Sequence, residues 1–240
     1  VLIRSDGDDV PSFAAFRQKT GDLAWKGNLA PTPEKGKGWS AAEASPLLVR
    51  LGSRDAVLCN FYRGVGAVWA DTGEKCYTDP IVGLKNRGRA QVVANEGYLF
   101  MHGAVMTRLQ PDGTIRKLWD RPLGIAEYNV SYSHTIIRDG RLFVFTPDRA
   151  TNPTAPGKVR MLDAETGAEL ASLPAAAKGA MLWADGMLYL QDNRPGMVLF
   201  EPTRDGLREV SSFKLPLPTH GSGAGIQLFT PPVVAEGRLF

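Results

Sequence analysis

Histidines and carboxylates are the first residues in this sequence that could hold a metal ion. The three histidines stand alone, with no second His or Cys at the short spacing that a zinc or iron site needs: they are His102, His134 and His220. The stretch SDGDDV at 5–10 groups carboxylates around a glycine, but it lacks the ligand spacing and the closing Glu of a calcium loop. We therefore predict no metal site and interpret 5–10 as a solvated turn.

The two cysteines, Cys59 and Cys76, are candidates for a disulfide. The strand pattern given below puts Cys59 in the second strand and Cys76 in the fourth strand of one sheet. Two strand spacings separate their backbones by about 9–10 Å, whereas a disulfide needs Cα atoms within about 7 Å. We predict two free cysteines.

Two short motifs imitate catalytic signatures without their context. HGSGAG at 220–225 is rich in glycine, but it has neither the following Lys-Ser/Thr of a P-loop nor the strand-then-helix frame of a dinucleotide site. SSFK at 211–214 matches Ser-x-x-Lys, yet it falls on an expected strand without the companion motifs of penicillin-recognising enzymes. No catalytic residue is predicted.

The elements that would position any site residue repeat along the chain. A turn signal occurs in KTGDLAW (19–25), DTGEKCY (71–77) and ETGAELA (165–171), with looser copies at 111–119 and 204–210; its glycines are Gly21, Gly73, Gly113, Gly167 and Gly206. A second signal alternates with it, in NEGYLFM (95–101), RDGRLFV (138–144), ADGMLYL (184–190) and AEGRLF (235–240). Successive glycines within a series lie 39 to 54 residues apart, a period typical of four-stranded repeats.

Each repeat has the pattern of four short strands. In 134–173 these are HTIIR, RLFVF, KVRML and AELASL, joined by an Asp-Gly turn, a loop and the turn DAETG. No longer segment carries a capped helical period. We predict an all-β fold, a β-propeller of four-stranded antiparallel blades, in which the Gly after Thr supplies the positive φ of a hairpin.

Three segments resemble the quinoprotein-type, or PQQ-like, propeller repeat. KVRMLDAETGAELASL (158–173) and FAAFRQKTGDLAW (13–25) are similar to its Ala-Leu-Asp, Thr-Gly and Trp pattern, and TPPVVAEGRLF (230–240) to its first two strands. The resemblance covers nearly the whole chain. It implies a ring of about seven or eight blades and an extracytoplasmic location, as in quinone-dependent alcohol dehydrogenases, outer-membrane assembly lipoproteins and many secreted repeat proteins.

The repeats predict a single propeller domain over 1–240 with about five blade equivalents. We expect a partial blade at 1–29, blades at 45–79, 90–121, 134–173 and 179–213, and the start of a further blade at 230–240. The chain starts without Met and stops inside an expected strand, so we expect a piece of a larger ring. The alternative is a five-bladed ring closed by the two partial blades.

In the family pattern, a Trp five residues after the turn Thr packs on the neighbouring blade, near an Ala five residues before that Thr. The Trp places hold Trp25, Tyr77, Lys117 (with Trp119 two further on), Ala171 and Val210. The Ala places hold Ala15, Ala67, Thr107, Met161 and Phe200. We interpret these residues and the turn glycines as structural.

The expected binding surface is the face that carries the long loops. Loops from a fourth strand to the next first strand share a face with the second-to-third strand loops, and loops vary while the scaffold stays rigid. Here they span 30–44, 80–89, 122–133, 146–157 and 214–229. Aromatics mixed with Arg are typical of binding hot spots. The candidate ligand-binding residues are Trp39, Tyr62, Arg63, His102, Tyr128, Tyr132, Arg149, Arg194 and His220.

Composition narrows the function further. Net charge is +3 with scattered basic residues, which indicates no nucleic-acid partner, and no apolar run is long enough to span a bilayer. The leading hypothesis is a non-catalytic binding or scaffold protein outside the cytoplasm, without a cofactor, that engages a protein, peptide or glycan. The alternatives are a quinone-dependent (PQQ) alcohol dehydrogenase-like oxidoreductase with calcium, whose typical vicinal Cys pair is missing here, and a carbohydrate-active propeller enzyme.

Overall fold

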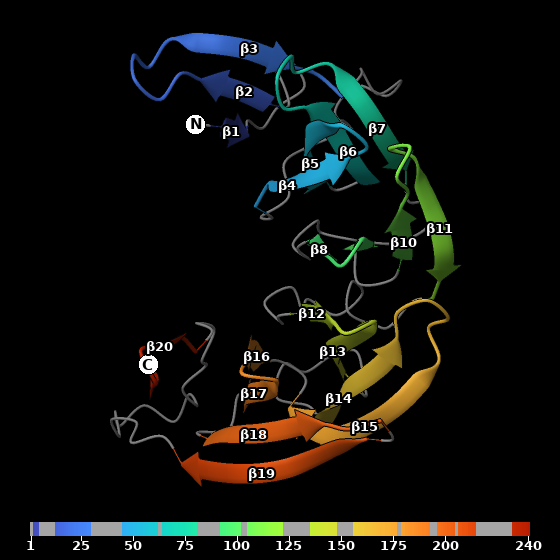
Figure 1. Cartoon of the computed structure of the whole chain (residues 1–240), viewed down its shortest axis with the longest axis vertical. Coiled ribbons are helices and arrows are strands. Elements are labelled where there is room, and N and C mark those ends of the chain that lie inside the picture. The colour runs from blue at the N-terminus through green and yellow to red at the C-terminus, as the bar shows by residue number, and fades with distance from the viewer. Residues whose placement is uncertain are drawn as a thin grey trace. The chain divides into compact units, whose positions relative to one another are not determined.

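The computed structural model describes residues 2–4, 13–29, 45–61, 64–80, 92–101, 105–121, 135–147, 156–176, 179–192, 196–204, 206–214 and 232–240. Every regular element in these ranges is a β-strand, and within each sheet strands that follow one another in the chain pair antiparallel (Figure 1). The predicted all-β fold of four-stranded antiparallel blades is confirmed.

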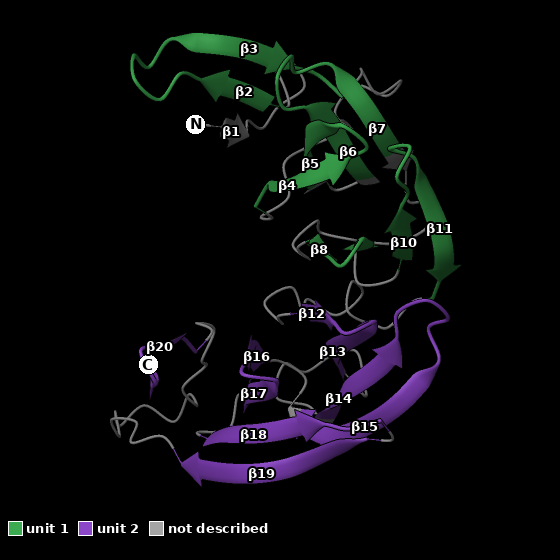
Figure 2. Cartoon of the chain, viewed as in Figure 1, with its two compact units in different colours: residues 1–122 green, residues 123–240 purple. Residues whose placement is uncertain are grey.

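The chain divides into two compact units, Val1–Pro122 and Leu123–Phe240 (Figure 2). Unit 1 begins with the three-stranded sheet β1 (Leu2–Arg4), β2 (Phe13–Phe16) and β3 (Leu23–Gly27). Its second sheet contains β4 (Leu47–Leu51), β5 (Arg54–Phe61), β6 (Gly64–Trp69) and β7 (Lys75–Pro80). Its third contains β8 (Val93–Asn95), β9 (Tyr98–Met101), β10 (Val105–Leu109) and β11 (Ile115–Asp120).

Unit 2 begins with the sheet β12 (Thr135–Arg138), β13 (Arg141–Pro147), β14 (Pro156–Asp163) and β15 (Glu169–Ala176). It continues with β16 (Gly179–Ala184), β17 (Met187–Asp192), β18 (Gly196–Pro202) and β19 (Leu207–Lys214), and then with the hairpin β20 (Val234–Ala235) and β21 (Arg238–Leu239). The assignment of 1–240 to one domain stays a prediction.

Two-residue turns join the first and second strands of the four-stranded sheets and of the hairpin β20–β21. Four are acid-Gly pairs in which both residues have positive φ, between 50° and 76°: Glu96–Gly97, Asp139–Gly140, Asp185–Gly186 and Glu236–Gly237. This is the type I′ conformation, whose twist matches that of the paired strands. The corresponding turn between β4 and β5 starts with Gly52, where a Cβ would stand only 3.3 Å from the backbone nitrogen of Gly113 in the next sheet. That close approach explains a glycine in place of an acid.

The turns between third and fourth strands, together with the turn between β2 and β3, have three lengths. In three sheets a Gly N–H donates to the carbonyl four residues earlier; these pairs are Gly21 to Arg17, Gly73 to Trp69 and Gly167 to Asp163. Between β10 and β11 the turn is one residue shorter, because the Gly113 N–H donates to the Gln110 carbonyl. Between β18 and β19 it is shorter still, since the Thr203 N–H donates to the Gly206 carbonyl.

Each fourth strand, and β3 as its counterpart in the three-stranded sheet, contains one β-bulge. The register skips a single residue there, which is Ala24, Cys76, Leu118, Leu170 or Val210. A bulge increases strand twist and interrupts the row of free backbone groups that an edge strand presents. The bulges therefore suit strands at the outer edge of a sheet.

The interior between neighbouring sheets is apolar. In unit 1 one cluster, with Phe13, Leu29 and Val68, lies between the first two sheets, and a second, with Leu58 and Met101, lies between the next two. In unit 2 a cluster with Phe143, Phe145 and Met161 joins the two four-stranded sheets. The buried polar side chains among the described residues are Thr107, Thr146 and Gln191. These apolar contacts hold the strands in place as a frame for their connections.

Candidate functional site

Antiparallel order gives each sheet two different ends. In β4–β7, Phe61 pairs with Gly64 and Gly64 with Pro80, so these strand termini lie together at one end of the sheet. Leu51 and Arg54 pair at the opposite end. We call the first the loop end, because the longest connections leave from it, together with short ones such as 62–63 and 193–195. We call the second the turn end, because tight turns close it.

The nine predicted ligand-binding residues all belong to connections that begin and end at a loop end. Every one lies outside the described residues: Trp39, Tyr62, Arg63, His102, Tyr128, Tyr132, Arg149, Arg194 and His220. The described strands determine from which end of which sheet each connection departs. Whether the nine side chains come together stays a prediction.

One described strand brings an aromatic side chain and charges to a loop end. Just after β11, the Arg121 guanidinium lies 6.0 Å from the centroid of the Trp119 ring of that strand. The centroid of the Trp119 ring lies 5.9 Å from that of the Phe100 ring on β9. Lys117 Nζ lies 3.5 Å from Asp120 Oδ2. The strand leads directly into the connection that carries Tyr128 and Tyr132. Sequence reasoning did not include Trp119 and Arg121 among the binding candidates, although the signal was available: Trp-Asp-Arg immediately before a long loop.

Charged groups at the turn ends pair with one another. In the β4–β7 sheet Arg54 lies 4.2 Å from the centroid of the Trp69 ring and 2.6 Å from Asp71 Oδ1. The hydrogen bond from Arg54 lowers the pKa of the Asp71 carboxyl, and hydrogen bonds from Thr114 lower the pKa of Asp112. A lowered pKa makes a carboxylate a weak base, so these two groups suit turn bracing rather than proton transfer.

The cysteines are both free, which confirms that prediction. Cys59 is fully buried on β5, and burial raises the pKa of the half-buried Cys76 thiol to about 11. Since the thiolate is the nucleophile, the raised pKa makes Cys76 a weaker nucleophile near neutral pH than an ordinary cysteine.

Within the described ranges, no group of three or more His, Cys, Asp or Glu side chains is arranged to hold a metal ion. In the same ranges no helix has the length and apolar character needed to cross a membrane.

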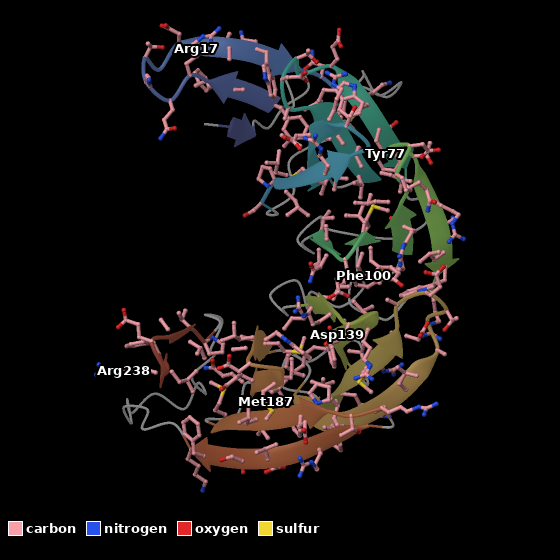
Figure 3. All side chains as sticks on the ribbon, viewed as in Figure 1. Arg17, Tyr77, Phe100, Asp139, Met187 and Arg238 are labelled. Carbon is pink, nitrogen blue, oxygen red and sulfur yellow. The ribbon has the colours of Figure 1, made fainter. Side chains whose placement is uncertain are left out.

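The repeat residues join neighbouring sheets. Trp25 Nε1 donates a hydrogen bond of 3.0 Å to the Ala70 carbonyl of the next sheet. Its ring covers Gly73, where a Cβ would lie 2.5 Å from Trp25 Cε3. Tyr77 on β7, labelled in Figure 3, packs against the apolar cluster that contains Leu58 and Met101. The turn glycines Gly21, Gly73, Gly113 and Gly167 have φ between 71° and 88°, which only glycine adopts without steric cost.

The register corrects two of the Trp places. The row beside the bulge pairs Ala15 with Trp25, Ala67 with Tyr77 and Met161 with Ala171, as spacing from the turn indicates. In β8–β11 the same row pairs Met106 with Trp119, so the assignment to Thr107 and Lys117 is wrong.

In β16–β19 the row pairs Leu199 with Ser211, while Val210 is the bulged residue itself and Phe200 pairs with Glu209. In both sheets the turn is shorter, and three residue pairs lie between the bulge and the turn. The other three sheets have one pair there. Counting from the turn glycine therefore misses the row.

Sequence comparison gives no relative: no protein-family model matches, and no curated protein matches the chain. Solved structures do match. BamB from Moraxella catarrhalis aligns with a TM-score of 0.59 at 13% identity, over 98% of this chain and 66% of that one. The computationally designed Ika8 protein aligns with a TM-score of 0.59 at 12% identity, over 99% of this chain and 64% of that one.

A quinohemoprotein alcohol dehydrogenase, ADHIIG from Pseudomonas putida HK5, aligns with a TM-score of 0.54 at 14% identity. That alignment covers 83% of this chain and 38% of the dehydrogenase. The chain thus spans just under two thirds of the first two structures. At these identities the similarity concerns the fold, and at that level it bears out the resemblance to PQQ-like β-propellers.

Proposed function

We propose that this propeller is a non-catalytic binding or scaffold protein that acts outside the cytoplasm and engages a protein, peptide or glycan through its loop ends. The location rests on the resemblance to quinoprotein-type propellers, a family of extracytoplasmic proteins. No cofactor is part of this proposal.

The observation that carries the proposal is the difference between the two ends of each sheet. The turn ends are closed by short turns whose residues serve the backbone, such as Asp163, which accepts hydrogen bonds from the N–H and hydroxyl of Thr166. The longest connections leave from the loop ends, and Trp39, Tyr128 and Tyr132 belong to them. Side chains that no turn geometry requires are free to be selected for a partner.

The loop end of β11 supports the same proposal. The Trp119 ring contacts that of Phe100, and the Arg121 guanidinium lies 6.0 Å from its centroid, so an aromatic side chain and a positive charge lie side by side. Aromatic and Arg side chains together dominate the energetics of protein interfaces.

The alternative is a quinone-dependent alcohol dehydrogenase, favoured by the alignment with ADHIIG. Among the described residues, no group of three or more His, Cys, Asp or Glu side chains is arranged to hold the calcium that this alternative implies. The two cysteines are separated by β6 and are not vicinal. We derive no reaction step from this group.

The test of the binding proposal uses a glycan array and pull-down from an extracytoplasmic extract with the purified chain. Trp39→Ala and Tyr128→Ala should each weaken the retained signal at least tenfold, as expected for hot-spot residues. The matched control is Asp185→Asn in a turn-end pair, since Asn-Gly also suits the type I′ turn. Unchanged binding by both loop variants, with melting as in the parent chain, would remove these residues from the proposal.

The alternative is tested separately. Pyrroloquinoline quinone is added with calcium, and reduction of a dye by a primary alcohol is followed. Tight quinone binding and calcium-dependent dye reduction would replace the binding proposal with the dehydrogenase, whatever the pull-down shows.

A further inference from the structure

We draw no further inference here: the strongest candidate, the apolar face of the sheet β16–β19 where Phe213 stays 47% exposed beside its cross-strand partner Met197, carries nothing because no feature of the described residues shows what covers it.

Discussion

Two contacts between neighbouring sheets can be compared: the one between the first two sheets of unit 1 and the one between the two four-stranded sheets of unit 2. In unit 1 the large side chain comes from the preceding sheet, and in unit 2 it comes from the following sheet. In unit 1 the bulk comes from Trp25 on the outer strand β3 of the preceding sheet, which reaches Ala70 and Gly73 of the following one. In unit 2 the matching outer-strand residue is Ala171. There the following sheet supplies Trp183 from its first strand, β16, and the centroid of the Trp183 ring lies 5.6 Å from that of Phe143.

The two contacts share a well-filled space between facing sheets, but the large side chain that fills it stands at a different position of the repeat in each. Face-to-face sheets pack about 10 Å apart, and that space must be filled to the density of a protein interior. A large side chain on either facing sheet meets the requirement. The two solutions differ in what they demand of their surroundings: Trp25 needs a hydrogen-bond acceptor and a glycine, whereas Trp183 needs an aromatic partner.

The largest effect is expected from Phe143→Ala, which removes the aromatic partner in unit 2. Phe143 is fully buried, and truncation of such a side chain costs about 3–5 kcal/mol through lost burial and a cavity. Urea unfolding followed by tryptophan fluorescence measures the loss. The control is Phe213→Ala, since Phe213 is 47% exposed; an equal loss for both variants would mean that the Phe143–Trp183 contact is not what holds these sheets.

The next effect separates backbone strain from packing in unit 1. Gly21 and Gly73 both have φ of 77°, but nothing lies within 4 Å of a Cβ at Gly21, while a Cβ at Gly73 meets the Trp25 ring at 2.5 Å. Gly21→Ala should cost about 1–2 kcal/mol from left-handed strain alone. Gly73→Ala should cost about 2–4 kcal/mol, because overpacking adds to that strain.

A double-mutant cycle checks the cause. In a Trp25→Ala background, the cost of Gly73→Ala should fall close to that of Gly21→Ala in the parent chain. The colliding ring is then gone, and of the three atoms nearest to that Cβ only the Lys26 carbonyl oxygen, at 3.2 Å, remains. If Gly73→Ala remains the costlier change without Trp25, the ring is not the reason for the glycine.

These glycines also show what the sequence could predict. The order of strands, the alternation of the two turn signals and the positive φ at Gly21 and Gly73 follow from local chemistry, because Gly tolerates the left-handed region and Asp-Gly or Glu-Gly pairs suit two-residue turns. The location of Trp119 and Ser211 in the row beside the bulge does not follow. It depends on where a bulge interrupts pairing with the third strand, and a hairpin that is two pairs longer shifts the row without changing the repeat period.

The candidate binding residues are a harder problem for sequence reasoning. Periodicity constrains side chains that face a neighbouring sheet, as with Tyr77 and Ala67. It places no constraint on Trp39 or Tyr128, because no strand pairing sets the positions of loop residues. The sequence pattern therefore predicts the strands and turns of the scaffold, whereas for the binding site it predicts only which loop segments contribute.

A smaller effect concerns the hydrogen bond that distinguishes Trp25 from Trp183. Trp25→Phe keeps an aromatic ring but removes the bond to the Ala70 carbonyl, whereas Trp183→Phe keeps the ring contact with Phe143. Each variant loses similar apolar area, so Trp25→Phe should be the costlier by about 1 kcal/mol, the net worth of one hydrogen bond. Urea midpoints in the two variants measure this difference; equal losses would show that unit 1 is held by ring packing alone.

The smallest effect is the pH dependence of the turn that presents Ala70 to Trp25. Asp71 follows Ala70, and its pKa is lowered by the hydrogen bond from Arg54. A carboxyl whose folded pKa lies below the unfolded value of about 3.9 adds stability above that value and loses it as pH falls through the folded pKa. The unfolding midpoints of the parent chain and Asp71→Asn should therefore differ slightly at neutral pH and converge in strong acid.

Arg54→Met is the control variant: it should return the Asp71 pKa, which carbon-13 NMR can follow, toward its ordinary range. A gap between the midpoints that persists at the acid end would mean that Asp71 acts through the shape of the turn rather than through its charge, and the Trp25 contact would then be independent of pH, like its counterpart between Phe143 and Trp183.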